Sequence, residues 1–256
     1  MKNRNGMTDR AVQEIRHGRK LARDGAEAIW GWDTAAGRLR ARRRGELISG
    51  KAGLHSGMKV LEIGCGTGLF TEIFAESGAA ILAIDISVDL LDQALARKLP
   101  PERVRFVAVP FEDPSICGPF DAIIGSSVLH HLDLAPALGR IFSLLSPGGV
   151  MVFAEPNMLN PQIMVQKNIP WLKERLGDSP DETAFFAPRL RRRLLVHGFA
   201  DVEIIPFDWL HPLTPRAIIM PVLTFGTFLE RLPIIKNFAG SLLITARRPV
   251  GKYEQI

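Results

Sequence analysis

A glycine-rich loop between an apolar run and an amphipathic run constrains this chain most strongly. The stretch VLEIGCGTGLFTEIFAESG, residues 60–78, places Gly64, Gly66 and Gly68 directly after apolar residues. Glycine accepts positive φ and lets a ligand approach the backbone, because no Cβ stands in the way. The pattern therefore predicts a buried strand that turns through this loop into a helix near 69–77, with a ligand held against the loop.

The alternation of strand and helix continues to residue 155. Such βα units predict a parallel sheet with helices on both faces, and ligands of these sheets bind outside the carboxyl ends of the strands. A helix near 182–197 and two late strands, at 202–210 and 241–249, are expected to follow. The expected strands of the first part are 59–63, 79–87, 104–109, 120–127 and 150–155, and the expected helices are 69–77, 88–97 and 134–145, the last ended by Pro147-Gly148-Gly149.

Length and composition bound the class of protein. The 256 residues suffice for one domain with embellishments, and 46% hydrophobic and 23% charged residues are usual for globular chains. Two cysteines form neither a disulfide framework nor a metal cluster, so we expect no metal. The start of the sequence lacks the apolar core of a secretory signal, and no apolar run reaches the roughly 20 residues that span a bilayer. We therefore expect a cytoplasmic protein.

The positive charge of the chain lies near its start. Residues 1–51 carry 13 Lys and Arg against 6 Asp and Glu, whereas the rest is slightly acidic. We interpret 1–51 as a basic helical arm and 52–256 as the main domain. The arm fits either a solvated helix face or a surface that meets phosphates, anionic lipid or an acidic substrate. Few aromatic residues accompany its arginines, so we do not expect nucleic acid as a partner.

An acidic residue ends the second expected strand. Asp85 can accept hydrogen bonds from both hydroxyls of a ribose, an arrangement that fits any cofactor containing adenosine. The glycines, however, do not have the G-x-G-x-x-G spacing of nicotinamide-binding loops. Glu62, before the loop, would repel a pyrophosphate but suits a cationic or amine-bearing ligand.

Two later blocks complete the set of motifs: FDAIIGSSVLHHL at 120–132 and LLSPGGVMVFAEPN at 144–157. Together with E-x-G-x-G-x-G at 62–68 and the acid Asp85, they resemble the class I S-adenosylmethionine-dependent methyltransferases over roughly residues 55–156. The resemblance implies an α/β, Rossmann-like, seven-stranded and mostly parallel sheet, with an antiparallel last strand between the fifth and sixth. The insertions, at 157–180 and 211–238, are expected to form a substrate lid.

The resemblance also implies S-adenosylmethionine as cofactor and roles for single residues. Asp85 would hold the ribose, Ile86 would pack on the adenine, and Ser126 would lie near the amino group and the substrate. Pro110 occupies a slot that is usually acidic, so a contact to the adenine amine would come from Glu112 or from backbone. The implied cofactor-binding residues are Glu62, Gly64, Cys65, Gly66, Gly68, Asp85, Ile86, Phe111, Glu112 and Ser126.

Histidines are the candidate catalytic residues, because a hydroxyl acceptor needs a general base near neutral pH. His130 and His131 follow the fourth strand, and we expect one to face the cleft and the other to pack away, unless LHHL only begins a helix. His211, after the sixth strand, is a second candidate. Glu155 and Asn157 are expected at the rim of the site, where they would position an acceptor.

The segment 216–238 is the most apolar part of the chain. A helix over 217–230 would be apolar nearly all round, which fits a packed lid, a dimer surface or a membrane interface. With the arginine-rich arm, it allows peripheral binding to the inner face of an anionic membrane. The oligomeric state stays open.

We interpret the chain as a methyltransferase that moves a methyl group to an oxygen of a small acceptor, one that is apolar or lipid-linked. Two alternatives stay open: N-methylation of a small amine, and a non-catalytic partner subunit that binds S-adenosylmethionine. The fourth strand lacks the Asn/Asp-Pro-Pro-aromatic block of enzymes that methylate amino groups of bases, which again argues against nucleic acid.

Overall fold

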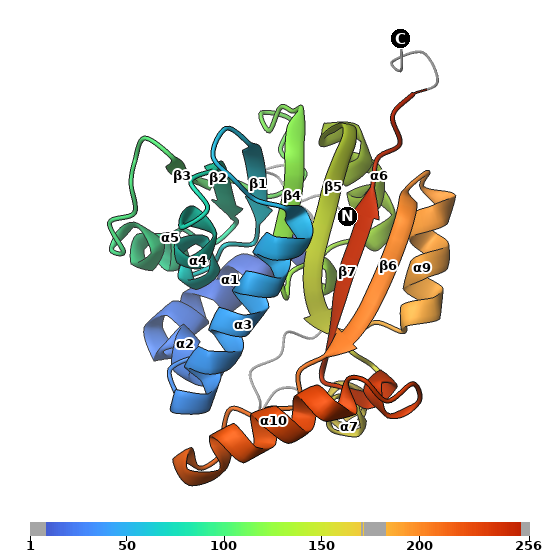
Figure 1. Ribbon diagram of the computed structural model, residues 1–256. Helices are drawn as coiled ribbons and strands as arrows, with labels where there is room; N and C mark the ends of the chain where they lie inside the picture. Colours follow the sequence, from blue (N-terminus) through green and yellow to red (C-terminus); the bar gives the residue numbers. More distant parts are fainter. Residues whose placement is uncertain (1–8, 170, 172–182, 252–256) are drawn as a thin grey trace.

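A seven-stranded sheet forms the centre of the computed structural model, which describes residues 9–169, 171 and 183–251 (Figure 1). The strands are β1 (Lys59–Ile63), β2 (Ala80–Asp85), β3 (Val104–Ala108), β4 (Phe120–Ser126), β5 (Leu145–Pro156), β6 (Ala200–Phe207) and β7 (Ser241–Arg247). They lie in the order β3-β2-β1-β4-β5-β7-β6. Only β7 pairs antiparallel with its neighbours, β5 and β6, within the described sheet. The predicted fold class is confirmed, including the last strand between the fifth and sixth.

Helices cover both faces of this sheet. The described helices are α1 (Asp9–Asp24), α2 (Ala26–Ile29), α3 (Ala35–Ala52), α4 (Leu69–Ala75), α5 (Val88–Leu95), α6 (Leu134–Leu144), α7 (Pro161–Asn168), α9 (Ala187–Val196) and α10 (Ile219–Leu229). On one face, Ile48 of α3 and Phe74 of α4 are buried in a common apolar cluster. On the other face, Leu138 of α6 and Leu194 of α9 belong to a second cluster. These layers bury the strands on both faces, as their near-continuous apolar runs predict.

The glycine loop joins β1 to α4 as the sequence predicts. Gly68 precedes α4 with a φ of 74°, and a Cβ at this position would lie 2.9 Å from the Cβ of Ala94 in α5. This glycine therefore allows α4 and α5 to pack closely, and that packing fixes the direction in which the loop leaves β1.

The basic arm is an integral part of the fold. α3 continues past the boundary predicted after residue 51 and packs along the sheet. Three of its arginines form ion pairs within the molecule: Arg40 with Asp208 after β6, Arg43 with Glu230 after α10, and Arg42 with Glu46 and Glu76. Part of the positive charge of residues 1–51, which could have bound an external anion, is thus neutralised by carboxylates of the same chain.

Some predicted boundaries differ from the structure. α6 ends at Leu144, before the predicted Pro-Gly-Gly stop, because β5 begins at Leu145 and continues through those residues. The predicted insertion 157–180 contains α7, but residues 170 and 172–180 lie outside the described residues, as does residue 182 at the start of the next predicted helix. None of the helices within the described ranges is both long enough and apolar enough to cross a bilayer.

Candidate functional site

A cavity of about 980 Å³ opens at the carboxyl ends of the central strands, where the sequence predicts the ligand site. The glycine loop and the residues after β2 and β4 form one side of its wall, and α1 and the segment around α2 form the other. The predicted site residues that line it are Gly64, Cys65, Gly66, Asp85, Ile86, Phe111, Glu112, Ser126, His130, His131 and His211. The cavity therefore brings together most of the residues that the sequence separates.

Bare backbone forms the floor of the cavity at the glycine loop. Gly64 has a φ of 68°, and a Cβ at this position would lie 2.4 Å from Cγ2 of Val128. The loop and the chain after β4 therefore approach each other more closely than any larger residue would permit.

Asp85 is held in a fixed orientation at the end of β2. The backbone N–H groups of Gly66 and Ser87 donate to its two carboxylate oxygens, each at 2.8 Å. Burial raises the pKa of Asp85, although these two hydrogen bonds oppose the shift. An acceptor placed in this way at the cavity wall suits the hydroxyl groups of a ribose.

Two predicted cofactor residues, Glu62 and Gly68, do not line the cavity. The Glu62 side chain is buried on the core side of the loop, and its Oε2 has no hydrogen-bond partner among the described residues. Gly68 faces α5 instead. These two residues therefore lie off the cavity wall and shape the loop from behind, and a direct contact with the ligand stays a prediction.

Glu62 gives the stability of the protein a pH dependence. Burial raises the pKa of its carboxyl from the ordinary 4.5 to about 8. Between these values the folded chain keeps a proton that the unfolded chain loses, so the free energy of unfolding falls as pH rises, by up to about 1.4 kcal/mol per pH unit. We expect Glu62→Gln to remove this decline between pH 5 and 8. Urea titrations at several pH values measure the free energy of unfolding of both proteins. Parallel declines with pH in wild type and Glu62→Gln would contradict the raised pKa of Glu62 as the cause.

The two adjacent histidines have different surroundings. His130 is buried, and its Nδ1 lies 2.6 Å from Oε2 of Glu155, which also accepts the backbone N–H groups of Val128 and Leu129. His131 is more exposed at the cavity, with its Nδ1 3.2 Å from Oε2 of Glu14 in α1. The short 3₁₀ turn at Leu129–His131 produces this division. Both histidines line the cavity, but His130 is buried and held by Glu155, whereas His131 is the more exposed of the two.

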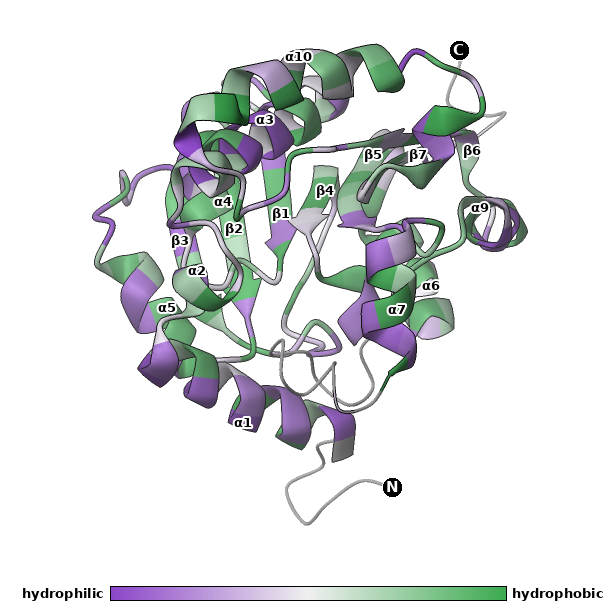
Figure 2. Ribbon diagram, turned by 90° about the horizontal axis from the view of Figure 1, so that it is seen from below, coloured by the Kyte–Doolittle hydropathy of each residue, from purple (hydrophilic) through white to green (hydrophobic). Residues whose placement is uncertain are grey.

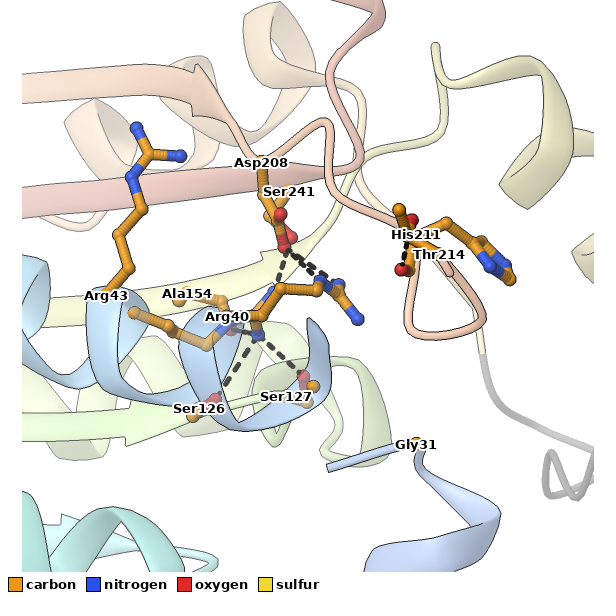
Figure 3. A network of polar contacts seen from close by, with 12 residues as sticks. Gly31, Arg40, Arg43, Ser126, Ser127, Ala154, Asp208, His211, Thr214 and Ser241 are labelled. Carbon is orange, nitrogen blue, oxygen red and sulfur yellow. Dashed lines mark hydrogen bonds and ion pairs between the residues drawn. The ribbon is translucent and has the colours of Figure 1, made fainter. Parts of the chain in front are cut away.

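A buried cation also lies in the cavity wall. Arg44 of α3 is 3% exposed, and its Nη1 donates to the hydroxyls of Ser127 and Ser126 at 3.0 and 3.2 Å. Figure 3 labels these two serines, together with Ser241 and Asp208. Its Nη2 donates to Ser241, and its Nε has no hydrogen-bond partner within the described chain. Burial lowers the pKa of Arg44 to about 10, so the guanidinium stays charged at neutral pH. The hydrogen bonds of Arg44 go to neutral oxygens and its guanidinium lies over the rings of Trp32 and Phe207, while the charges of Asp208 and Glu155 act on it without a direct ion pair among the described residues. Such a cation can still bind an anion in direct contact.

Known proteins share both this sequence pattern and this fold. Residues 61–151 match a family model described as a methyltransferase domain. The ubiquinone biosynthesis O-methyltransferase of Psychrobacter arcticus is 30% identical over 173 residues, which are 63% of this chain and 66% of that protein. The malonyl-acyl-carrier-protein O-methyltransferase of Serratia marcescens is 30% identical over 131 residues, which are 50% of this chain and 49% of that protein. The chain thus matches less than two thirds of the length of each of these relatives, 66% and 49%.

A solved structure extends the likeness to the whole fold. The N-methyltransferase NodS from Bradyrhizobium japonicum WM9, in complex with S-adenosylhomocysteine, superposes with a TM-score of 0.61 at 20% identity, over 93% of this chain and 98% of that one. The chain belongs to the class I S-adenosylmethionine-dependent methyltransferases. The matched domain contains the glycine loop, Asp85 and both central histidines, whereas α1, α3 and α10 of this methyltransferase lie outside it.

Glu155, Asn157 and His211 are also expected at the site from the sequence. Glu155 and Asn157 are buried and not at the rim, because Glu155 binds the turn after β4, while the Asn157 side chain donates to the carbonyl of Ala239. His211 does lie at the rim, but Leu213 N–H donates to its Nδ1, and its Nε2 lies 3.0 Å from Gln162 Nε2. Partial burial lowers the pKa of His211, so it is neutral near pH 7. With both ring nitrogens engaged, it is a weaker candidate base than His131.

Sequence reasoning did not single out Glu14 or Arg44. A signal for Arg44 was present, because it shares one face of α3 with the buried Ala41, Ile48 and Ala52, at spacings of three, four and eight residues. An arginine on an otherwise apolar helix face is an exception to the amphipathic pattern and marks an inward-facing cation. The docking of α1 over the cavity, which brings Glu14 to His131, has no comparable signal.

Proposed function

We propose that this methyltransferase moves a methyl group from S-adenosylmethionine to an oxygen of a small acceptor that is apolar or lipid-linked. The observation that carries the proposal is the placement of His131, beside Glu14, in the same cavity as Asp85 and the glycine loop. A hydroxyl oxygen is a weak nucleophile until it loses its proton, so a base in the donor cavity is what an oxygen acceptor requires.

The residues of the cavity suit the parts of the donor. When bound, S-adenosylmethionine supplies a methyl group on a positively charged sulfur. Asp85 would accept hydrogen bonds from its ribose, Ile86 and Phe111 would offer apolar contacts to the adenine, and Glu112 would reach the adenine amine. Arg44 would bind the carboxylate of the amino-acid part, an anion in direct contact that its present hydrogen-bond partners do not provide.

His131 would act as general base toward the acceptor. Its Nδ1 faces Glu14, which leaves Nε2 as the nitrogen that receives the proton of the acceptor hydroxyl. The acceptor oxygen would lose this proton as it bonds to the methyl carbon, while the bond from that carbon to sulfur breaks and S-adenosylhomocysteine leaves. The Glu14 carboxylate would stabilise the His131 imidazolium until the imidazolium releases its proton to water. The buried His130–Glu155 pair would hold the turn that carries His131.

Apolar side chains support the choice of acceptor. Trp30, Trp32, Leu210 and Pro212 line the part of the cavity contributed by the elements outside the matched domain. Such side chains can bury an apolar acceptor beside the polar groups that the same elements contribute to the cavity. The name of one relative places it in the biosynthesis of ubiquinone, an apolar quinone, which is consistent with this class of acceptor.

A substrate screen tests the proposal. The purified protein is incubated with S-adenosylmethionine and with polar or lipid fractions of a cell extract, and S-adenosylhomocysteine is measured. We expect turnover with the lipid fraction and an oxygen-methylated product, identified by mass spectrometry, and no turnover with His131→Ala. A product methylated at nitrogen, or turnover confined to the polar fraction, would contradict the proposed acceptor.

A further inference from the structure

Large apolar side chains are exposed along one face of α10 and the chain on either side of it. Figure 2 shows this helix largely in green along one edge of the molecule, and in Figure 1 it lies beyond the end of the sheet toward which β5 and β6 point. We call this face the α10 surface; its members are Leu213, Ile218, Met220, Phe225, Phe228 and Ile234, each between 47% and 78% exposed. Soluble monomers rarely expose so many large apolar side chains together unless the face binds something.

The opposite face of α10 is firmly packed, so the exposure is not a sign of a loose helix. Ile219 is buried in a cluster with Ala36 of α3 and Leu210. Gly226 is buried too, and a Cβ there would lie 2.9 Å from the Cβ of Trp209. The helix is therefore anchored by one side, and its remaining apolar side chains are presented outward.

The charges around the α10 surface are positive. Glu230 is the acidic residue of the segment 211–238, and Arg43 binds both of its carboxylate oxygens, at 2.5 and 2.9 Å. Arg216, Arg231 and Lys236 form no ion pair with any described residue. An apolar face with free cations on its flanks is complementary to a surface that is negatively charged outside and apolar within.

The α10 surface is also continuous with the cavity. His211, Pro212 and Leu213 line the cavity and lead directly into the segment that carries the surface. Trp209, which packs beneath Gly226, lines the cavity as well. Whatever covers the α10 surface therefore adjoins the entrance through which an acceptor reaches His131.

We infer that the α10 surface docks on an anionic lipid bilayer, with α10 lying in the plane of the interface. The surface consists mainly of aromatic and aliphatic side chains, with only three separated cations beside them. This composition favours a bilayer as the partner, because an acidic carrier protein would require a denser cluster of cations. The docked protein presents its cavity to the membrane, so an apolar acceptor enters from the lipid. This last point rests on the proposed function, whereas the docking itself does not.

Vesicle flotation tests the docking. The full chain is mixed with vesicles of phosphatidylcholine alone or of equal parts phosphatidylcholine and phosphatidylglycerol. We expect the wild-type chain to bind the anionic vesicles. The double variant Phe225→Ser and Phe228→Ser should lose at least about tenfold in affinity for these vesicles. The single variants Arg216→Gln and Arg231→Gln should each lose about fivefold in affinity. The control is Leu195→Ser with Val196→Ser, which removes two equally exposed apolar side chains from α9 and is expected to bind like wild type.

Two further measurements separate the possible failures. Binding of S-adenosylhomocysteine by the α10 variants, measured by calorimetry, should equal that of wild type, which shows that the donor site and the fold are intact. Absence of wild-type binding to anionic vesicles, or equal losses in the α9 control, would overturn the inference and leave the proposed function standing. Retention on immobilised acyl carrier protein without vesicle binding would overturn it in favour of a protein partner.

Discussion

Replacement of Asp85 by Asn is expected to weaken the binding of S-adenosylhomocysteine by about 100-fold. The neutral amide loses the charge that strengthens hydrogen bonds from ribose hydroxyls, and such charge-assisted bonds are worth about 1.5–3 kcal/mol each. Asn keeps one oxygen for the backbone N–H of Gly66 or Ser87, so the turn after β2 should persist. Titration calorimetry on the two proteins gives both dissociation constants.

The matched control is Asp92→Asn. Asp92 lies exposed on α5, outside the cavity wall, so its replacement removes the same charge without touching the proposed donor site. We expect it to bind S-adenosylhomocysteine like wild type. If Asp85→Asn retained wild-type affinity and an unchanged melting temperature, Asp85 would have no part in donor binding.

Turnover on the true acceptor should fall by about 10²–10⁴-fold in His131→Gln, the range typical for the loss of a general base. Glutamine fills a similar space and can still face Glu14, but it accepts no proton at neutral pH. Binding of S-adenosylhomocysteine should stay close to that of wild type. A single-turnover measurement at saturating donor separates the chemical step from binding.

The neighbouring His130 provides the contrast. His130→Ala removes the buried contact with Glu155, so we expect a lower melting temperature, with turnover per folded molecule reduced far less than in His131→Gln. Glu14→Gln should keep the fold and lose part of the activity, because the base remains but its carboxylate partner does not. Full activity of the His131→Gln variant would exclude His131 as the general base and leave His211 as the next candidate.

Much of the donor side of the site was predictable because its determinants are local. The strand, glycine loop and helix at 59–77 follow each other in the sequence. Asp85 ends β2 and His131 lies in the turn that follows β4, and the carboxyl ends of these strands meet at one edge of the sheet. Glu62 lies off the cavity wall, and the sequence does not show this for a physical reason. β1 is buried on both faces and has no polar alternation, so its sequence does not indicate which way the side chain of Glu62 points.

The elements around the sheet were less predictable, because their places depend on contacts between distant segments. Glu14 reaches His131 only through the docking of α1, and Arg44 reaches Ser127 only through the packing of α3. For α10 the helix was expected, but a helix that is apolar nearly all round does not indicate which face is packed. Gly226, beneath which Trp209 lies, marks the packed face only once the structure is known.

The position of β7 has a consequence for the order in which the protein folds. β7 is the last described strand, yet it lies between β5 and β6 and is their shared hydrogen-bonding partner. During synthesis, β6 has no place in the sheet until residues 241–247 have left the ribosome, whereas β1 to β5 can already pair. The half of the sheet that carries the glycine loop can therefore form early, and α10, within the β6–β7 connection, is drawn to its place by the final strand.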